Sequence, residues 1–278
     1  MKAPHENAPL RSTFTRGPRT PAAVLTEAYE TGVPCPPLRG SLIPEGDVEA
    51  AYAVQREQVD AWLAAGRRQV GAKIGLTARA VQEAFGVFQP DFGVLMADAA
   101  VPDGAEIALD RLLQPRVEAE VAFVLGADLA EPRVTTVDVI RATEYLLPAI
   151  EVVDSRVAGW DISIVDTVAD NASSGLFVLG TRPTRLSDVD LRLCGAVLEH
   201  AGEPVSVGAG AACLGNPLHA VAWLAATLAT AGQPLRAGDV VLSGALGPMV
   251  PVTPGAAYEA RISGLGSVRA CFDKGESR

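Results

Sequence analysis

The chain has 278 residues, of which 49% are hydrophobic and 20% charged, so it can bury a substantial core. Its formal net charge of -10, from 23 basic and 33 acidic residues, repels phosphate backbones and disfavours nucleic-acid binding. The four cysteines, Cys35, Cys194, Cys213 and Cys271, show no C-x-x-C spacing. They therefore predict reduced thiols in a cytoplasmic protein.

The N-terminal segment and the most apolar stretch of the chain bear on targeting. The first 20 residues contain no apolar block, and residues 220–231 are too few to cross a bilayer, which needs ~20 residues. We therefore expect neither a signal peptide nor a membrane span. Residues 1–19 are interpreted as a disordered N-terminal extension.

Residues 20–68 predict a small helical N-terminal region. Thr20 followed by Pro21 is typical of a helix N-terminus, and Gly32 ends that helix. A second helix is predicted over residues 47–65, because apolar residues recur there at helical spacing.

Residues 69–278 are predicted to form a β domain. The run 70–76 is interpreted as a strand, followed by a short helix that Thr77 caps and Gly86 ends. Further elements are strands at 117–125, 149–153, 176–179, 191–198, 204–207, 239–243, 249–252 and 258–272, a hairpin turn at 201–202 and a helix at 216–232. The sequence thus predicts an α+β fold, with a small helical N-terminal region and a mixed, largely antiparallel β domain. No P-loop or dinucleotide motif is present, so no nucleotide site is expected.

Two carboxylates lie inside an apolar strand predicted at 115–125. Side chains alternate between the faces of a strand, so Glu118 and Glu120 point the same way while the other face is apolar. Glu151 lies in a second apolar run. Burying neighbouring like charges is costly, so either a divalent metal ion or basic side chains such as Arg116 must compensate. The pattern indicates a site for a hard cation.

Six sequence blocks in a fixed order carry a family resemblance. They are Lys73–Thr77 (KIGLT), Gln89–Gly93 (QPDFG), Pro115–Leu125 (PRVEAEVAFVL), Ile150–Arg156 (IEVVDSR), Asp166–Gly175 (DTVADNASSG) and Leu242–Gly247 (LSGALG). Together they resemble the 2-keto-4-pentenoate hydratases, within the fumarylacetoacetate hydrolase superfamily, from about Pro21 to Phe272. The resemblance implies a β domain of the fumarylacetoacetate hydrolase C-terminal type. One departure is Ala78, where a serine is common in the family.

The resemblance implies three metal ligands, Glu118, Glu120 and Glu151. An all-oxygen set without His or Cys favours Mg²⁺ or Mn²⁺ over zinc. Three carboxylates leave positions on such an ion for two substrate oxygens and a water molecule. The alternative is that these glutamates only form ion pairs with Arg116 or Arg156.

The resemblance also implies that Lys73 and Asp91 are catalytic. Lys73 would bind the C2 oxygen of the substrate or relay a proton, and the alternative is a lysine that faces solvent. Asp91 would act as general acid or base with water. The alternative for Asp91 is an aspartate that hydrogen-bonds its own backbone in a Pro-Asp-Phe-Gly turn.

Three further polar residues are implied in substrate binding. Asn171 and Ser173 would position the substrate carboxylate or a water molecule, or else belong to a polar loop that caps the next strand. Ser243 would line the pocket, or else form a glycine-bearing turn. Arg156 is interpreted as orienting a ligand carboxylate rather than touching the substrate.

These residues lead to a reaction hypothesis. The chain is a hydro-lyase that hydrates 2-hydroxypenta-2,4-dienoate to 4-hydroxy-2-oxopentanoate in aromatic meta-cleavage degradation. Protonation at C5 gives an unsaturated ketone, and water then adds at C4 while a metal ion holds the developing enolate charge. Hydrolysis is disfavoured because His5, His200 and His219 all lie outside the early helical region, where hydrolases of the superfamily carry a catalytic His–Glu pair.

Two alternative functions remain at this point. One is a metal-dependent decarboxylase of a 2-oxo-enedioate such as 4-oxalocrotonate. The other is a catalytically silent partner subunit, which should have lost a metal ligand or Lys73, and none of these is missing. The expected partners are a small dienoate substrate, further copies of the chain in a homo-oligomer and another enzyme of the same pathway, without nucleic acid or membrane.

Overall fold

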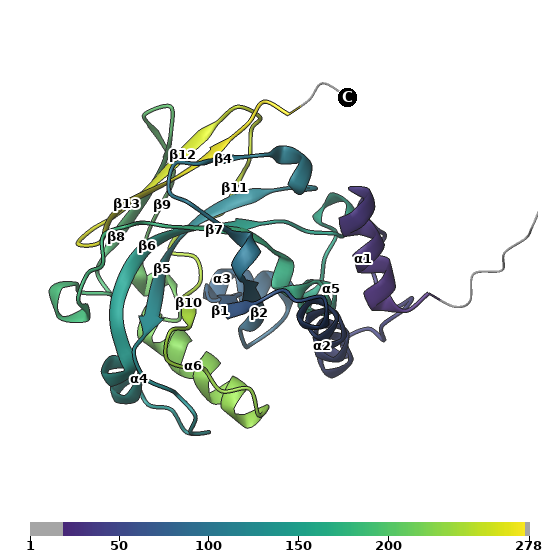
Figure 1. Ribbon diagram of the computed structural model, residues 1–278, viewed down its shortest axis with the longest axis horizontal. Coiled ribbons are helices and arrows are strands. Elements are labelled where there is room, and N and C mark those ends of the chain that lie inside the picture. Colours follow the sequence, from purple (N-terminus) through teal and green to yellow (C-terminus); the bar gives the residue numbers. More distant parts are fainter. Residues whose placement is uncertain (1–18, 276–278) are drawn as a thin grey trace, which may run out of the picture.

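Two β-sheets that pack face to face form the centre of the computed structural model, which describes residues 19–275 (Figure 1). The larger sheet contains β1 (Gln69–Gly75), β2 (Asp91–Met96), β3 (Ala100–Val101), β5 (Arg116–Leu125), β6 (Thr143–Val153), β7 (Ser174–Leu179), β10 (Val240–Leu242) and β11 (Val250–Pro251). The smaller sheet contains β4 (Glu106–Ile107), β8 (Gly195–His200), β9 (Glu203–Ala209), β12 (Ala257–Ile262) and β13 (Gly266–Phe272). Because β6 contacts both β12 and β13, the main apolar core lies between the two sheets.

The strand order places β5 in the middle of the larger sheet. The order is β2-β1-β10-β5-β6-β7-β3, and β11 also pairs with β5. The pairs β1–β10, β3–β7 and β4–β13 are parallel, and the other pairs of named strands are antiparallel. The prediction of an α+β fold with a mixed, largely antiparallel β domain is therefore confirmed.

The two N-terminal helices agree with the sequence prediction. In α1 (Pro21–Thr31), the Thr20 hydroxyl accepts a hydrogen bond from the Ala23 amide, and Gly32 ends the helix with a φ of +66°. In α2 (Val48–Ala64), the Asp47 carboxylate caps the N-terminus by accepting from the Ala50 amide. Both helices thus begin at residues whose side chains satisfy amides that the helix leaves unpaired.

The N-terminal helices share an apolar cluster with α5 (Ile164–Ala169), which belongs to the β domain. Leu25, Val54 and Val168 are buried together in this cluster. Figure 1 shows α1 and α2 beside α5, away from the smaller sheet. The boundary predicted at residue 68 stays a prediction, and the predicted extension at residues 1–19 lies outside the described residues apart from Arg19.

Two local predictions around the site were wrong. Thr77 does not cap α3 (Arg79–Phe85), because Ala78 occupies the N-cap and makes no side-chain cap hydrogen bond. Thr77 instead packs against Gly244, where an added Cβ would lie 2.4 Å from its hydroxyl oxygen. Asp91 is not in a turn but is the first residue of β2, which pairs with β1.

Two short helices, α4 (Thr136–Ala142) and α5, were not predicted from the sequence. Each begins with a capping box, Thr135 with Asp138 and Ser163 with Asp166, and this spacing is a readable sequence signal. The strand predicted at 191–198 begins only at Gly195, because residues 191–194 form a turn.

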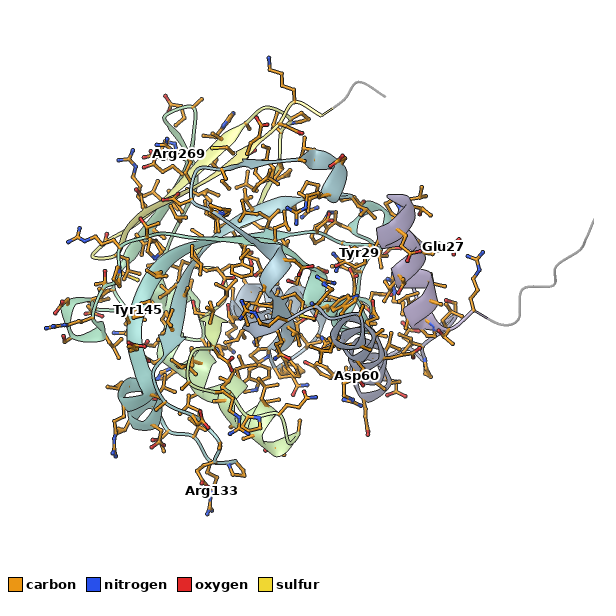
Figure 2. All side chains as sticks on the ribbon, viewed as in Figure 1. Glu27, Tyr29, Asp60, Arg133, Tyr145 and Arg269 are labelled. Carbon is orange, nitrogen blue, oxygen red and sulfur yellow. The ribbon has the colours of Figure 1, made fainter. Side chains whose placement is uncertain are left out.

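The last helix, α6 (Pro217–Thr230), was predicted correctly and lies beside α4 (Figure 1). Segment 210–230, which includes α6, is long and apolar enough to count as a membrane-span candidate, with a mean hydropathy of 1.2. The α-helix itself has 14 residues, fewer than the ~20 that a span needs, and it buries Val221 and Leu224 in the core. In Figure 2, Arg133 projects outward from the loop before α4, whereas Tyr29 points from α1 toward the strands.

The remaining helical elements are short 3₁₀ segments. They are η1 (Ala97–Ala99), η2 (Leu109–Arg111), η3 (Ala158–Trp160), η4 (Asn171–Ser173), η5 (Leu186–Asp188) and η6 (Gly210–Ala212). Of these, η4 follows α5 directly and leads into β7, which places it next to the carboxylates described below.

Candidate active site

Glu118, Glu120 and Glu151 converge on one face of the larger sheet. The antiparallel register of β5 and β6 sets Glu118 directly opposite Glu151, and Glu120 follows two residues along the same face. One carboxylate oxygen from each lies within 4.8 Å of the others. The structure therefore brings together the three carboxylates that the sequence analysis singled out.

These carboxylates lack the partners that buried anions need. Glu120 and Glu151 are fully buried, and within the described residues Oε1 of Glu120 and both oxygens of Glu151 accept no hydrogen bond. Burial and the neighbouring Glu151 raise the pKa of Glu118 to about 7, and burial with Glu151 and Glu118 raises the pKa of Glu120 well above its ordinary value. An oxygen-preferring divalent cation fits this set, since it would satisfy the orphaned oxygens and offset the repulsion.

Lys73 is the basic side chain that faces the carboxylates. It lies on β1 and is 2% exposed, and its Nζ is 3.1 Å from Oε1 of Glu151. That contact is an ion pair by distance without the alignment of a hydrogen bond. Burial by itself lowers the pKa of Lys73, but Glu151, Asp91 and the other two glutamates outweigh it, so the pKa is raised. Lys73 is therefore charged and does not face solvent.

Neither arginine proposed as an alternative partner pairs with the glutamates. The Arg116 guanidinium lies 4.3 Å from the ring centroid of Trp160, and its Nη1 is 3.9 Å from Sδ of Met249. Arg156 forms its ion pair with Asp170. The interpretation that Arg156 orients a ligand carboxylate is also wrong, because its partners are Asp170 and backbone carbonyls.

Glycines on β1 and β2 let Lys73 and Asp91 come close together. In the register of these strands Gly75 pairs with Asp91, and Lys73 pairs with Gly93. An added Cβ at Gly75 would lie 2.2 Å from Oδ1 of Asp91 and 3.6 Å from Nζ of Lys73. Oδ1 of Asp91 has no hydrogen-bond partner in the described part of the chain, and burial raises the pKa of this carboxyl to about 6.

A left-handed turn forms another wall of the site. Asn171, Ala172 and Ser173 have φ values of +51°, +52° and +51°, a conformation that costs about 1–2 kcal/mol per non-glycine residue. The side-chain amide of Asn171 accepts a hydrogen bond from the Val94 backbone amide at 2.8 Å and donates one to the Val94 carbonyl at 3.0 Å. An added Cβ at Gly93 would lie 2.4 Å from the Asn171 carbonyl oxygen, so the glycine makes room for the turn.

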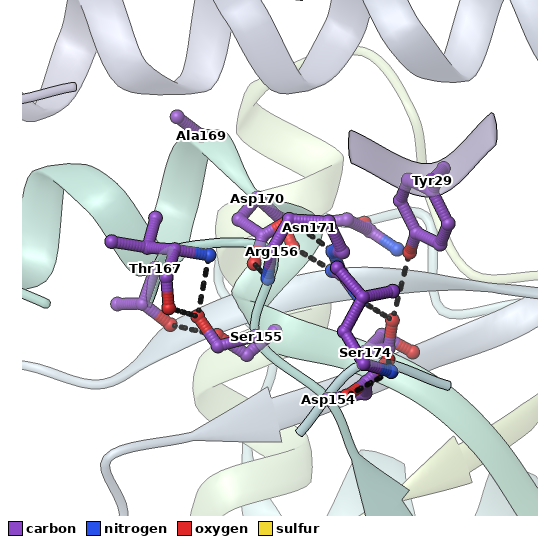
Figure 3. A network of polar contacts seen from close by, with 12 residues as sticks. Tyr29, Asp154, Ser155, Arg156, Thr167, Ala169, Asp170, Asn171 and Ser174 are labelled. Carbon is purple, nitrogen blue, oxygen red and sulfur yellow. Dashed lines mark hydrogen bonds and ion pairs between the residues drawn. The ribbon is translucent and has the colours of Figure 1, made fainter. Parts of the chain in front are cut away.

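A buried polar network anchors this turn from behind (Figure 3). Arg156 donates from Nε and its backbone amide to the Asp170 carboxylate, and from Nη1 to the Ser174 carbonyl at 3.0 Å. Tyr29 of α1 stacks over the guanidinium at 4.3 Å and donates its hydroxyl to the same Ser174 carbonyl. These contacts offset the cost of the left-handed backbone and explain why α1 packs here.

The residues predicted to bind substrate divide into two groups. Ser173 lines a cavity of about 320 Å³ together with Lys73, Asp91 and Glu118. Asn171 and Ser243 do not line it. Asn171 supports the turn, as described above, and its predicted role in substrate binding stays a prediction.

Ser243 likewise supports the site from behind. Its Oγ accepts from the Val121 amide at 3.4 Å and donates to the Gly244 carbonyl at 3.2 Å. The Gly244 amide in turn donates to Oε2 of Glu120 at 2.8 Å. Ser243 therefore helps to hold the loop that positions Glu120.

One polar residue and the apolar wall of the cavity were not predicted from the sequence. The hydroxyl of Thr167 on α5 lies 3.2 Å from that of Ser173, and Thr167 lines the cavity. The apolar lining includes Leu76, Val81, Phe85, Trp160, Ile162 and Met249. Lys73 is the only basic residue of this lining within the described chain. The arrangement can hold a small, largely apolar molecule that carries an anionic group.

Comparison with known proteins agrees with this geometry. Residues 63–273 match the family model described as fumarylacetoacetate (FAA) hydrolase, C-terminal. The chain belongs to the fumarylacetoacetate hydrolase family. This membership confirms the predicted resemblance and the type of β domain.

Within the fumarylacetoacetate hydrolase family, the chain is similar to hydratases over nearly its whole length. A TodF product hydratase of Pseudomonas putida is 59% identical over 265 residues, which cover 95% of this chain and 98% of the relative. A 2-keto-4-pentenoate hydratase of Dechloromonas aromatica is 56% identical over 255 residues, covering 92% and 97%. The structure of a 4-oxalocrotonate decarboxylase from Pseudomonas putida G7, complexed with magnesium and adipate, has a TM-score of 0.87 and 40% identity and covers 91% and 95%.

Proposed function

We propose that the chain is a metal-dependent hydratase that adds water to 2-hydroxypenta-2,4-dienoate (2-keto-4-pentenoate), giving 4-hydroxy-2-oxopentanoate in aromatic meta-cleavage degradation. The observation that carries the proposal is the convergence of three buried carboxylates within 4.8 Å beside a cavity lined by Lys73 and Asp91. The similarity to hydratases at 59% and 56% identity supports the reaction class.

Glu118, Glu120 and Glu151 would hold the metal ion. The ligand set is all oxygen, which suits Mg²⁺ or Mn²⁺, and the related decarboxylase structure contains magnesium. When bound, the ion would supply Lewis-acid stabilisation of negative charge on the substrate. Its positive charge would also offset the repulsion among the carboxylates and favour the ionised forms of Glu118 and Glu120, whose pKa values burial raises.

Lys73 and Asp91 would carry the proton chemistry. The Lys73 ammonium is buried and charged, so it can donate a hydrogen bond to the C2 oxygen of the substrate and stabilise an enolate there. Asp91 has an unpartnered oxygen and a pKa of about 6, which suits a group that takes up and releases protons near neutral pH. Gly75 keeps the two groups close enough to act on one small substrate.

The charge of the cavity distinguishes the hydratase from a decarboxylase of an enedioate. A 2-hydroxydienoate carries one carboxylate, whereas 4-oxalocrotonate carries two. Among the described residues that line the cavity, no basic side chain other than Lys73 is available for a second carboxylate. Burying that second charge against Phe85 or Ile162 would be costly, which favours the monoanion.

The decisive assay offers both substrates to the purified protein with and without Mg²⁺. We expect loss of dienoate absorbance with formation of 4-hydroxy-2-oxopentanoate, and no enzyme-dependent release of CO₂ from 4-oxalocrotonate. Activity after exhaustive chelation, or CO₂ release faster than hydration, would contradict the proposal.

The proposal extends to the assembly and its setting. We expect a homo-oligomer in the cytoplasm, which size-exclusion chromatography with light scattering would test. Exposed apolar side chains such as Val137 and Ile140 of α4, which are 60% and 46% exposed, support self-association. A monodisperse monomer at micromolar concentration would contradict this part of the proposal.

A further inference from the structure

Thr167 and Ser173 form a pair of hydroxyl groups inside the cavity. Their oxygens are 3.2 Å apart, and the residues are 6% and 4% exposed. Both line the same cavity as Asp91. Ser173 was predicted to position the substrate carboxylate or a water molecule, and Thr167 has had no role so far. The two hydroxyls are partners for each other and keep further hydrogen-bonding capacity toward the cavity.

The donors and acceptors that the two hydroxyls leave free indicate which ligand fits between them. Each hydroxyl has one proton and two lone pairs, and their mutual bond uses one proton. Thr167 and Asp91 line the same cavity, and the Thr167 hydroxyl acts to lower the pKa of the Asp91 carboxyl against the larger effect of burial. Either hydroxyl can donate to the other. When Ser173 donates to Thr167, the Thr167 proton is free to donate to Asp91, and the Ser173 oxygen keeps its lone pairs in the cavity that Asp91 also lines. Two acceptors in one cavity, the Ser173 oxygen and the Asp91 carboxylate, match the two protons of a water molecule.

The backbone holds both hydroxyls rigidly. Thr167 lies on α5, whose first turn is closed by the capping box of Ser163 and Asp166. Ser173 is held in its left-handed turn by hydrogen bonds from its amide to the Asp170 carbonyl and from the Asp154 amide to its own carbonyl, at 2.9 and 2.8 Å. Strained backbone of this sort is retained where it aims a functional group.

Resting on the proposed hydratase function, we propose that the hydroxyls of Thr167 and Ser173 position the water molecule that adds to C4 of the substrate, with Asp91 as its base. The water oxygen forms a bond to C4 as Asp91 takes one water proton. The π electrons of the C3–C4 double bond move to C2–C3, which places negative charge on the C2 oxygen near Lys73. The proton held by Asp91 then passes to C3, so the sum is one water molecule added across C3 and C4.

This role separates the two stages of the reaction. Conversion of the dienol to 2-oxopent-3-enoate needs a proton at C5 and no water molecule, whereas the second stage needs a positioned water molecule. Loss of the Thr167 hydroxyl should therefore slow hydration and leave ketonisation nearly intact. A general loss of structure would slow both stages together.

The test compares Thr167→Val, which keeps the shape and loses the hydroxyl, with Thr167→Ser, which keeps the hydroxyl. Thr227→Val on α6 is the matched control, because the Thr227 hydroxyl bonds a backbone carbonyl of its own helix outside the cavity. NMR in D₂O would follow the dienol, the enone and the hydrated product above the uncatalysed background. We expect Thr167→Val to lower the hydration rate roughly tenfold to a hundredfold and to release deuterated enone, since a hydrogen bond is worth about that factor. Thr167→Ser and Thr227→Val should keep the product ratio of the wild type.

An unchanged ratio of enone to hydrated product in folded Thr167→Val overturns the inference. Equal loss of hydration in folded Thr167→Ser and Thr167→Val also overturns it, because the hydroxyl would then not be the determinant. If Thr167→Val does not fold, Ser173→Ala carries the same test and the same expected release of enone. A wild-type protein that forms no hydrated product contradicts the proposed function itself, which is a different outcome from failure of the hydroxyl pair.

Discussion

Glu118 on β5 and Glu151 on β6 are direct cross-strand partners, although like charges in this position destabilise a sheet. Glu120 adds a third carboxylate to the same buried face. Without a bound cation, this repulsion lowers the free energy of unfolding. Occupancy of the site should therefore be visible in the unfolding of the protein, independently of catalysis.

The first prediction concerns Glu120→Gln. In chelator, the variant should unfold at a higher temperature than the wild type, because the substitution removes one of three crowded carboxylates. Mg²⁺ at 100 times its dissociation constant should stabilise the wild type by about 2.7 kcal/mol and leave the variant nearly unchanged. Calorimetry with and without Mg²⁺ measures both effects, and turnover should be lost in the variant.

The matched control for this prediction is Glu144→Gln, because Glu144 lies on the same strand as Glu151 but is exposed. It should show the wild-type response to Mg²⁺. An equal gain of stability from Mg²⁺ in Glu120→Gln and the wild type would remove Glu120 from the cation site.

The second prediction concerns Gly75→Ala. The new methyl group would meet Oδ1 of Asp91 at 2.2 Å, so the carboxylate must leave its present position. We expect a fall in kcat of at least tenfold with a small change in KM, because geometry at the reacting atoms is lost. Steady-state kinetics test this, and Gly195→Ala is the control, since its Cβ would meet nothing closer than Oγ of Ser263 at 3.4 Å. Wild-type kcat in Gly75→Ala would show that Asp91 needs no fixed position.

The third prediction concerns Lys73→Met. The substitution removes the Lys73 ammonium, which is the buried cation beside Glu151, and breaking such a pair costs about 3–5 kcal/mol. The chelated variant should therefore unfold at lower urea concentration than the chelated wild type, and turnover should be lost. Mg²⁺ should restore much of the lost stability and no turnover. Restored turnover would assign the chemistry to other groups.

The fourth prediction concerns pH and Asp166. Burial alone would raise the pKa of this carboxyl, but hydrogen bonds from Arg39 and Ser163 hold it below the ordinary value of 3.8. A lowered pKa means that the folded state binds fewer protons than the unfolded state. Ionised Asp166 therefore stabilises the folded state fully at pH values above the unfolded pKa of about 4. This stabilisation is lost as the pH falls through the pKa of Asp166 in the folded state.

Asp166→Asn should therefore cost about 1–3 kcal/mol at pH 7 and progressively less below pH 4. Urea unfolding of both proteins at pH 7, 5, 4 and 3.5 measures the difference. Asp161→Asn is the control, because Asp161 is 65% exposed in its pair with Arg39. If the difference in the free energy of unfolding between the wild type and Asp166→Asn grew as the pH fell, Asp166 would be protonated in the folded state.

Much of the architecture follows from local sequence signals. Proline, glycine and capping side chains fix α1, α2 and α6, and strand alternation places Glu118 and Glu120 on one face. The register of β5 against β6 does not follow from either strand alone, since it depends on pairing across the sheet. The meeting of Glu118 with Glu151 therefore needed the structure.

Polar residues in loops were the hardest to interpret. Asn171 and Ser243 were predicted to bind substrate. In the structure their side chains hydrogen-bond to the backbone of Val94 and Val121, and these partners are brought close only by tertiary packing. Thr167 was missed because the helix that carries it was missed. The Ser163–Asp166 capping box was the signal that would have indicated this helix.

The parallel pairing of β1 with β10 joins Lys73 to Leu242, near the other end of the chain. During synthesis residue 73 leaves the ribosome long before residue 242, so β1 cannot pair with β10 until most of the chain has been made. Contacts between such distant segments slow folding, because a long loop must close before they form. The enzyme should consequently acquire its catalytic cavity only after synthesis is almost finished, and fragments lacking the final forty residues should be inactive and prone to aggregation.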